Sequence, residues 1–218
     1  MSELNTYKQD PLSGGDPKQI VFLLHGLGSN GQDLISLAPY FGQAVPDAVF
    51  LSPDAPFPCD MAPGMMNSYQ WFSLQSRDQK DMEEGAENAF PILNNYIDSM
   101  LQYYDLKDEN AVLCGFSQGC MMSLYTAPRR NKPIAGVLGY SGALVGEEGL
   151  KSSDIQKMPI HLIHGEADDV VPVVAHRHAS AHLTRAGYDV SGHTTPHLTH
   201  SIDEQGIASG AAFLKSVL

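Results

Sequence analysis

The stretch AVLCGFSQGCMMSLY, from Ala111 to Tyr125, decides how the rest of the chain is interpreted. It opens with an apolar run that is typical of a buried strand, and from Gln118 it continues with residues that favour a helix. Between the two lies the pentapeptide GFSQG, residues 115–119. A serine with glycine two positions before and two positions after it, at a strand-to-helix junction, is the pattern of a nucleophile elbow. The stretch therefore predicts that Ser117 is held on a sharp, strained turn with its hydroxyl exposed.

The elbow explains why both flanking positions are glycine. A side chain at Gly115 or Gly119 would collide with the neighbouring strand or helix. The helix that starts after the serine also directs free N–H groups, and the positive end of its dipole, at charge that develops near the hydroxyl. Short matches of this kind occur by chance in loops, so the strand before it and the helix after it carry the interpretation.

Composition and charge limit the function classes. The chain has 218 residues, of which 43% are hydrophobic, so it can bury a sizeable core, and we expect one domain over residues 1–218. The formal net charge of -12 disfavours nucleic acid and anionic lipid as partners.

Cysteine content and hydropathy bear on location. The three cysteines, Cys59, Cys114 and Cys120, do not make an even disulfide set, which favours a reducing cytoplasm. The N-terminal residues lack the basic start and apolar stretch of a signal peptide. No segment reaches the ~18 apolar residues of a membrane span, so we expect no stable membrane insertion.

Strands alternate with helices along the chain. Strands are expected at 18–25, 48–52, 111–114, 134–141, 158–164 and 188–195, and helices at 33–45, 81–104, from 118, 173–186 and 202–218. Residues 1–17 hold one short edge strand at most, Pro91 should kink or split its helix, and 143–157 is a loop with at most a helical turn. Because the strands are apolar on both faces, the pattern predicts a mostly parallel central sheet with helices on both faces.

A glycine-rich turn, His25-Gly26-Leu27-Gly28, follows the strand at 18–25. Such a turn lets the backbone come close to a ligand. We expect the N–H of Leu27 and the N–H of Gln118 to form an oxyanion hole together. The alternative is a plain connector between strand and helix.

The irregular segment from Pro53 to about Gln79 is rich in proline, methionine and aromatic residues. Long loops in compact domains are usually functional or disordered, and this apolar content argues against disorder. The segment is interpreted as one wall of an apolar substrate groove that includes Trp71 and Phe72. The alternative is that these two side chains only pin the loop to the core.

A serine hydroxyl is a weak nucleophile at neutral pH, so it needs a base, and nine histidines are available. His200 is the preferred base because it stands just before a capping-box sequence, Ser201-Ile202-Asp203-Glu204, and so in the loop ahead of the last helix. His197 is the reserve. His25 opens the glycine-rich turn, where it is expected to brace the backbone, and His161 lies within a strand.

Two groups of histidines are spaced in the sequence as metal ligands can be. His176, His178 and His182 share a helix, and His193 and His197 stand near His200. A surface helix accounts for the first group, and no nearby cysteine or carboxylate set completes the second, so no metal is expected.

The carboxylate that orients the base should lie between serine and histidine in the sequence. Asp168 and Asp169, in the turn after the strand at 158–164, both satisfy this order. On position alone the two remain alternatives, and a plain polar turn ending at Pro172 is a third.

Four motifs occur together: residues 25–28, the elbow at 115–119, His164-Gly165-Glu166-Ala167-Asp168-Asp169-Val170-Val171-Pro172, and His200-Ser201. In this order they resemble the phospholipase/carboxylesterase family of α/β-hydrolases, which includes bacterial carboxylesterases and acyl-protein thioesterases. The resemblance covers nearly the whole chain. It implies the α/β-hydrolase fold, Asp168 as the acid, His200 as the base, Trp71-Phe72 on the acyl side of the site, and a possible homodimer. Asp169 stands where the family often has proline.

The sequence therefore predicts a serine carboxylesterase that hydrolyses short- to medium-chain carboxylic esters through an acyl-enzyme, without cofactor or metal. The partner would be a small-molecule or lipid-like acyl ester. The first alternative is an acyl-protein thioesterase or lysophospholipase that acts on longer acyl chains. A second, from another class, is a binding module that kept the scaffold without the chemistry.

Overall fold

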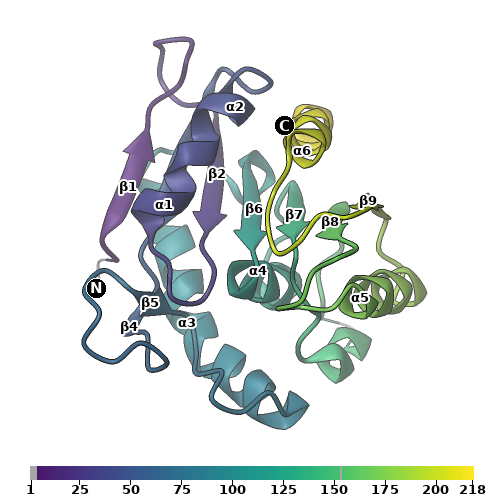
Figure 1. Cartoon of the computed structure of the whole chain (residues 1–218). Coiled ribbons are helices and arrows are strands. Elements are labelled where there is room, and N and C mark those ends of the chain that lie inside the picture. The colour runs from purple at the N-terminus through teal and green to yellow at the C-terminus, as the bar shows by residue number, and fades with distance from the viewer. Residues whose placement is uncertain (1–3, 153) are drawn as a thin grey trace.

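Seven strands form one sheet in the computed structural model, which describes residues 4–152 and 154–218 (Figure 1). The sheet order is β1-β3-β2-β6-β7-β8-β9. The strands are β1 (Thr6–Gln9), β2 (Gln19–Leu24), β3 (Ala48–Pro53), β6 (Ala111–Phe116), β7 (Gly136–Tyr140), β8 (Ile160–Gly165) and β9 (Val190–Thr195). Within this sheet β1 pairs with β3 antiparallel and the other pairings are parallel, which confirms the α/β-hydrolase fold with a mostly parallel sheet.

The connections place a switch point between β2 and β6. From β2 the chain moves outward to β3, and after α3 it returns to the other side of β2 and adds β6 to β9 in succession. Ligands of open α/β sheets bind at such a point, beyond the carboxyl ends of the strands. The turn after β2 and the elbow after β6 both lie there, so the topology brings Leu27 and Ser117 to one place.

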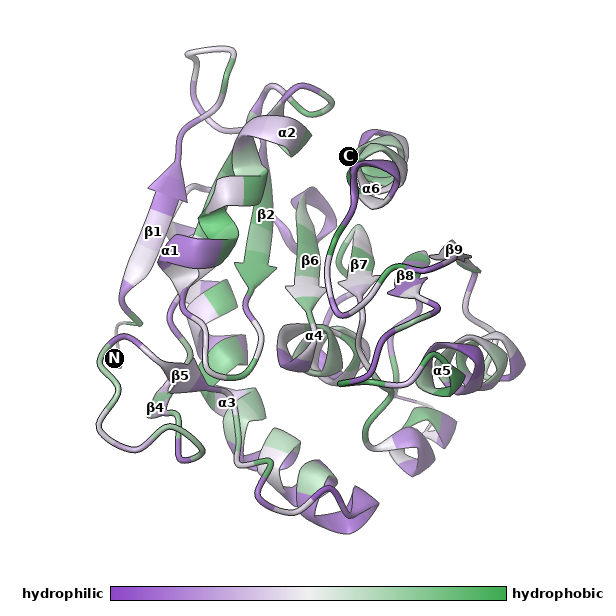
Figure 2. Cartoon of the chain, in the orientation of Figure 1, coloured by the Kyte–Doolittle hydropathy of each residue, from purple (hydrophilic) through white to green (hydrophobic). Residues whose placement is uncertain are grey.

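Helices cover both faces of the sheet because its strands are apolar on both sides. α3 (Gln79–Tyr103), α4 (Gln118–Arg129) and α5 (Val174–Arg185) bury one face, and α2 (Ala38–Gly42) and α6 (Glu204–Val217) bury the other. Alternate residues of β2 point to the two cores: Ile20 and Phe22 to the first, Val21 and Leu23 to the second. Figure 2 shows β2 and most of β6 as hydrophobic, and both hydrophobic and hydrophilic residues on α5 and α6. Burial of each such side chain stabilises the folded state by about 1.5–3 kcal/mol.

Three expectations about the helices need correction. The expected helix at 33–45 is instead α1 (Gly31–Leu34), a 3₁₀ turn η1 (Ile35–Leu37) and α2. Pro39 stands in the first turn of α2, where its missing N–H has no helical partner to lose. Of the two effects expected of Pro91, a kink or a split, the split does not occur, because the buried apolar face of a 25-residue helix outweighs one lost hydrogen bond. The cap of α6 is Asp203, which accepts from the Gly206 N–H at 2.7 Å, rather than Ser201.

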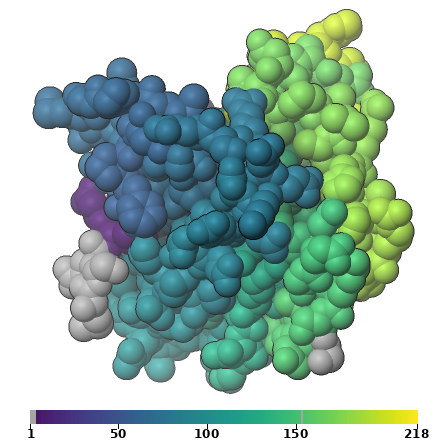
Figure 3. Space-filling model, turned by 90° about the horizontal axis from the view of Figure 1, so that it is seen from below, coloured from purple at the N-terminus to yellow at the C-terminus, as the bar shows by residue number. Residues whose placement is uncertain are grey.

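The segment after β3 holds one piece of regular structure that the sequence did not predict, a small antiparallel pair, β4 (Phe57–Pro58) and β5 (Tyr69–Gln70). Seen from below, this segment and the start of α3 meet the second half of the chain across the middle of the molecule (Figure 3). The loop expected at 143–157 carries a helical turn, η3 (Glu147–Lys151). Among the described helices, none has the length and apolar character needed to cross a bilayer.

Candidate active site

Ser117 occupies the strained turn that the sequence predicts. It follows β6, precedes α4, and has φ 54° and ψ -117°, a backbone conformation that few non-glycine residues adopt. The Ser117 N–H donates to the Tyr140 carbonyl oxygen at 2.9 Å, and the Ser117 carbonyl accepts from Met121 N–H at 3.1 Å. The neighbouring strand and the first turn of the helix therefore hold the backbone of the serine from both sides.

The glycines of the elbow make this close packing possible. A Cβ atom at Gly119 would overlap the carbonyl group of Leu24, and one at Gly115 would overlap the carbonyl group of Gly119. A Cβ at Gly26, in the turn after β2, would lie 3.1 Å from the Cβ of Ser117. The two turns thus approach each other at a distance that only glycine permits.

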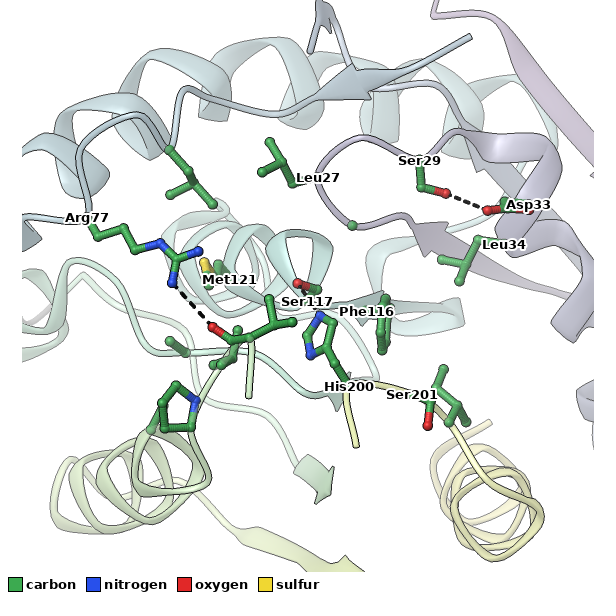
Figure 4. Close-up of a pocket in the computed structure, with 18 of the residues that line it drawn as sticks. Leu27, Ser29, Asp33, Leu34, Arg77, Phe116, Ser117, Met121, His200 and Ser201 are labelled. Atoms are coloured by element: carbon green, nitrogen blue, oxygen red, sulfur yellow. Dashed lines mark hydrogen bonds between the residues drawn. The ribbon is translucent and has the colours of Figure 1, made fainter. Parts of the chain in front are cut away.

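A chain of hydrogen bonds joins the three polar residues that were expected to converge. His200 Nε2 lies 3.0 Å from Ser117 Oγ, and His200 Nδ1 lies 2.7 Å from Asp168 Oδ2. His200 comes from the loop between β9 and α6, and Phe116 packs against its ring with centroids 4.8 Å apart. Figure 4 shows His200 pointing at Ser117 in the middle of the pocket. The first contact has the length that proton transfer between serine and imidazole requires, and the second holds the ring in place.

The carboxylate that meets His200 belongs to Asp168. Its other oxygen, Oδ1, accepts from the N–H groups of Val170 and Val171 at 2.9 and 2.8 Å. Burial opposes ionisation of this carboxyl, but the bonds from His200 and from the two backbone N–H groups outweigh it, so the pKa of Asp168 lies below its ordinary value. Asp169 is exposed, and no bond joins it to His200 in the part of the chain that the structure describes.

His164 is a member of the site's surroundings that sequence reasoning did not single out. Its ring is buried, its Nε2 donates to the Val171 carbonyl at 2.7 Å, and the same atom lies 3.3 Å from Asp168 Oδ2. The ring therefore fastens both ends of the turn that carries the acid. The signal was available in the sequence, because His164 opens the third motif of the family pattern.

Stability should fall in mild acid because of the buried rings of His25 and His164. Burial lowers the pKa of both below the ordinary 6.5. As the pH falls from 6.5 toward these lower values, the unfolded chain binds protons that the folded protein excludes, so the free energy of unfolding decreases. The slope is at most about 1.4 kcal/mol per pH unit for each ring. Urea denaturation between about pH 7.5 and 5.5, above the carboxylate range, measures it. Constant stability across that range would contradict the account.

The two expected oxyanion donors come from the turn after β2 and from the start of α4. Gln118 begins α4, where backbone N–H groups have no helical acceptor, and Leu27 lines the same pocket as Ser117. No described residue accepts a hydrogen bond from the N–H of Leu27 or of Gln118. His25 braces the backbone here, as expected: its Nδ1 donates to the Gly26 carbonyl at 2.7 Å and its Nε2 accepts from Ala55 N–H at 2.9 Å.

The side chain of Gln118 binds the backbone of Trp71 and Phe72. It is fully buried, its Oε1 accepts from Trp71 N–H at 2.9 Å, and its Nε2 donates to the Phe72 carbonyl at 2.7 Å. The Trp71 indole N–H donates to the His25 carbonyl at 3.0 Å. These bonds attach the segment after β5 to both turns of the site.

Trp71 and Phe72 do not form the cleft wall in this structure. Their exposed fractions are 0% and 3%, and neither belongs to the residues that line the pocket. This corrects the expectation of direct substrate contact. The geometry agrees with the alternative from the sequence, in which the pair pins the loop to the core, with Gln118 as the link.

Replacing Gln118 by alanine should cost about 2–4 kcal/mol of stability, because the Trp71 N–H and the Phe72 carbonyl would be buried without partners. The backbone N–H of residue 118 remains in this variant. Urea denaturation measures the loss, and Gln75→Ala, an exposed glutamine of the same segment, is the matched control, with an expected change under about 0.5 kcal/mol. A loss below about 1 kcal/mol for Gln118→Ala would show that the bonds from Gln118 to Trp71 and Phe72 do not stabilise the fold.

The pocket around Ser117 is a cleft of about 660 Å³. Its wall is largely apolar, with Leu74, Met82, Met121, Val171 and Pro172 among its members. In Figure 4, Asp33 and Leu34 lie on one side of Ser117, and Arg77 lies on the other. The volume and the apolar wall with a few convergent polar groups are typical of a small-molecule site.

Arg77 was not expected at the site. It lines the cleft, and its Nη1 donates to the Val170 carbonyl at 3.3 Å. The bond joins the segment before α3 to the turn that carries Asp168. Sequence reasoning had no signal for this contact, because the two segments are far apart in the chain.

The remaining histidines lie elsewhere. His197 is exposed with φ 63°, and among the described residues none joins it to Ser117. His161 bonds to the hydroxyls of Ser191 and Ser209 at 2.7 and 2.8 Å, and His176 Nε2 lies 3.2 Å from the Leu162 carbonyl.

Comparison with known proteins agrees with this geometry. The family described as Phospholipase/Carboxylesterase matches residues 12–218. The chain belongs to the phospholipase/carboxylesterase family. It is therefore a serine hydrolase, and within the family an esterase or thioesterase.

Individual relatives carry both kinds of description. The chain is 29% identical to an acyl-protein thioesterase 1 of Mycosarcoma maydis, over 100% of this chain and 99% of the relative. It is 25% identical to esterase YpfH of Escherichia coli, over 87% and 79%. Among solved structures, esterase PE8 has a TM-score of 0.92 at 35% identity, covering 99% of this chain and 100% of PE8. The carboxylesterase of Bacillus cereus, at 16% identity, shares the fold with a TM-score of 0.77.

Proposed function

We propose that this protein is a serine carboxylesterase that hydrolyses short- to medium-chain carboxylic esters. The observation that carries the proposal is the chain of bonds from Ser117 through His200 to Asp168, at the centre of an apolar cleft. The same residues in a binding module would have no reason to be held at these distances on a strained turn.

In the proposed reaction, Ser117 Oγ attacks the carbonyl carbon of the ester and its proton passes to His200 Nε2. The ionised Asp168 holds the ring with Nδ1 protonated and stabilises the imidazolium that forms. His200 then gives the proton to the leaving alcohol as the carbon–oxygen bond breaks, which leaves an acyl group on Ser117. Water attacks this acyl-enzyme while His200 takes one of its protons. His200 then donates that proton to Ser117 Oγ as the bond between Oγ and the acyl carbon breaks and the acid is released.

Negative charge develops on the carbonyl oxygen in each tetrahedral intermediate. The N–H groups of Leu27 and Gln118 have no described protein acceptor, and they lie next to the nucleophile. We assign them to the oxyanion, where each such donor stabilises the transition state by about 3 kcal/mol. The reaction needs no cofactor, because proton transfer and charge stabilisation both come from the chain itself.

Acyl groups of modest length are the first choice of substrate. A net charge of -12 gives the protein no attraction to anionic lipid surfaces, where long-chain substrates concentrate. The bond from Arg77 to Val170 also joins two walls on one side of the cleft and so limits the room for a long chain there. The similarity to acyl-protein thioesterases favours the alternative, removal of long acyl chains from protein or lipid.

A chain-length series of p-nitrophenyl esters, with matched thioesters, separates the two. We expect kcat/KM to be highest at short or medium acyl chains and to fall for long ones. An optimum at long chains, or on thioesters, would establish the alternative instead.

Arg77→Ala extends this test to the cleft wall. Loss of the Arg77 bond should raise the ratio of long-chain to short-chain kcat/KM severalfold, while Arg77→Lys, which keeps charge but not the fork of donors, should lie between. An unchanged ratio in both variants would remove Arg77 from acyl selection.

Location and assembly extend the proposal. We keep the reducing cytoplasm as the expected location, because Cys59, Cys114 and Cys120 are all free and buried. The family resemblance also implies a homodimer, and light scattering at micromolar protein concentration tests it. Nucleic acid is not expected as a partner, because the acidic surface repels it.

A further inference from the structure

The geometry points to a Zn²⁺ site outside the cleft, formed by Glu147, His178 and His182. The ligand atoms of the three side chains all lie within 4.8 Å of one another. None of the three lines the cleft around Ser117. Two come from α5 and the third from η3, which lies beside α5 (Figure 1).

The two histidines are arranged as a chelating pair. They stand four residues apart on α5, so they share one face of the helix, and their ring centroids are 5.1 Å apart. A single carboxylate oxygen, Glu147 Oε2, lies 2.7 Å from His178 Nε2 and 3.3 Å from His182 Nδ1. One carboxylate oxygen thus lies close to both ring nitrogens. A metal ion among these three atoms would take the place of the hydrogen bonds and bind all three as ligands.

The two distances from Glu147 to the histidines fit a zinc ion after a small adjustment, and the two ring nitrogens lie within 4.8 Å of each other. Zn–N and Zn–O bonds of about 2.0–2.2 Å with tetrahedral angles place ligand atoms about 3.3 Å apart. The His182 to Glu147 distance already has this value, and the His178 to Glu147 distance has to open by about half an ångström. The side chain of His178 is 45% exposed, so it can move without disturbing the core. On binding, the proton of His178 moves to Nδ1, and Nε2 becomes the ligand atom.

The neighbouring charges do not favour a cation. Glu148, next to Glu147, is paired with Lys151 at 2.6 Å. Arg185 opposes a divalent cation, because its Nη2 lies 3.2 Å from His182 Nδ1. Two imidazoles and one carboxylate select Zn²⁺ over Mg²⁺ and Ca²⁺, which prefer oxygen ligands, and three protein ligands leave the fourth position to water.

The site would join two segments that reach the cleft. Ala143, in the segment before η3, and Ala175, at the start of α5, both line the pocket around Ser117. A metal ion between η3 and α5 would fasten this side of the cleft without touching the reacting groups. The sequence alone did not reveal the third ligand, because Glu147 stands 31 residues before His178.

Calorimetric titration of the untagged, EDTA-treated chain with ZnCl₂ tests the proposal. We expect one high-affinity site, and a rise in Tm of about 5–10 °C when Zn²⁺ is about 100-fold above its Kd. MgCl₂ at the same concentration should not change Tm. An equal rise with Mg²⁺ would overturn the proposal, because it would reflect general screening of the acidic protein.

Variants locate the ion. His178→Ala, His182→Ala and Glu147→Gln should each weaken Zn²⁺ binding about tenfold or more, and Arg185→Ala should strengthen it. His197→Ala, which removes an exposed histidine elsewhere, should leave the Kd within about twofold. Unchanged binding in the double variant His178→Ala/His182→Ala would place the ion elsewhere and end the proposal. Each variant's Tm without zinc shows whether it is folded.

Discussion

Replacing Ser117 by alanine should lower kcat for p-nitrophenyl short-chain esters by a factor on the order of 10⁶, the scale seen when a triad nucleophile is removed. The same change should abolish labelling by a fluorophosphonate. The reason is that the variant lacks the hydroxyl, which lies 3.0 Å from His200 Nε2 and is the group that attacks the ester. The variant should still hydrolyse the ester faster than water alone does, because the cleft and the oxyanion donors are intact.

The matched control is Ser99→Ala, a serine of α3 whose hydroxyl donates to the carbonyl of Asn95 at 2.8 Å. It should leave kcat and labelling unchanged. Circular dichroism on both variants shows that the fold is kept. If Ser117→Ala retained ester hydrolysis and labelling, Ser117 would have no part in the mechanism.

Replacing Asp168 by asparagine should lower kcat by about 10⁴-fold, because the amide stabilises the wrong tautomer of His200. Asp168 Oδ2 accepts from His200 Nδ1 at 2.7 Å, and because a carboxylate can only accept, it keeps that ring nitrogen protonated while Nε2 faces the serine. Steady-state kinetics with the same esters measure the effect, mainly in kcat.

Asp169→Asn is the matched control, one residue further along the same turn. Its side chain is exposed, so kcat should stay within about threefold of the parent protein. The pair of variants decides between the two carboxylates that the sequence left as alternatives. A large loss in Asp169→Asn with little loss in Asp168→Asn would reverse the assignment of the acid.

The site could be predicted from the sequence where chemistry depends on local pattern. The elbow glycines around Ser117, the turn after β2 and the position of His200 ahead of the last helix all leave marks within a few residues. Parallel strands then bring these turns to one edge of the sheet, because the carboxyl ends of neighbouring strands lie together. The order of motifs therefore carried most of the information about the site.

The parts that could not be predicted depend on contacts between distant segments. The role of Trp71 was misjudged because nothing in its own segment shows that Gln118, 47 residues later, accepts its N–H. The bond from Arg77 to Val170 and the approach of Glu147 to α5 are of the same kind. The helix expected at 33–45 breaks for a local reason, Pro39, which the periodicity of its apolar residues concealed.

The most direct measurement of the central claim is detection of the acyl-enzyme itself. The protein is mixed with p-nitrophenyl acetate, quenched in acid within the first turnover, and examined by intact mass and by peptide mapping. The account predicts a mass increase of one acetyl group, located on the peptide that contains Ser117, and no such increase in Ser117→Ala. Ester turnover with no acylated protein, or with the acetyl group on another residue, would contradict it.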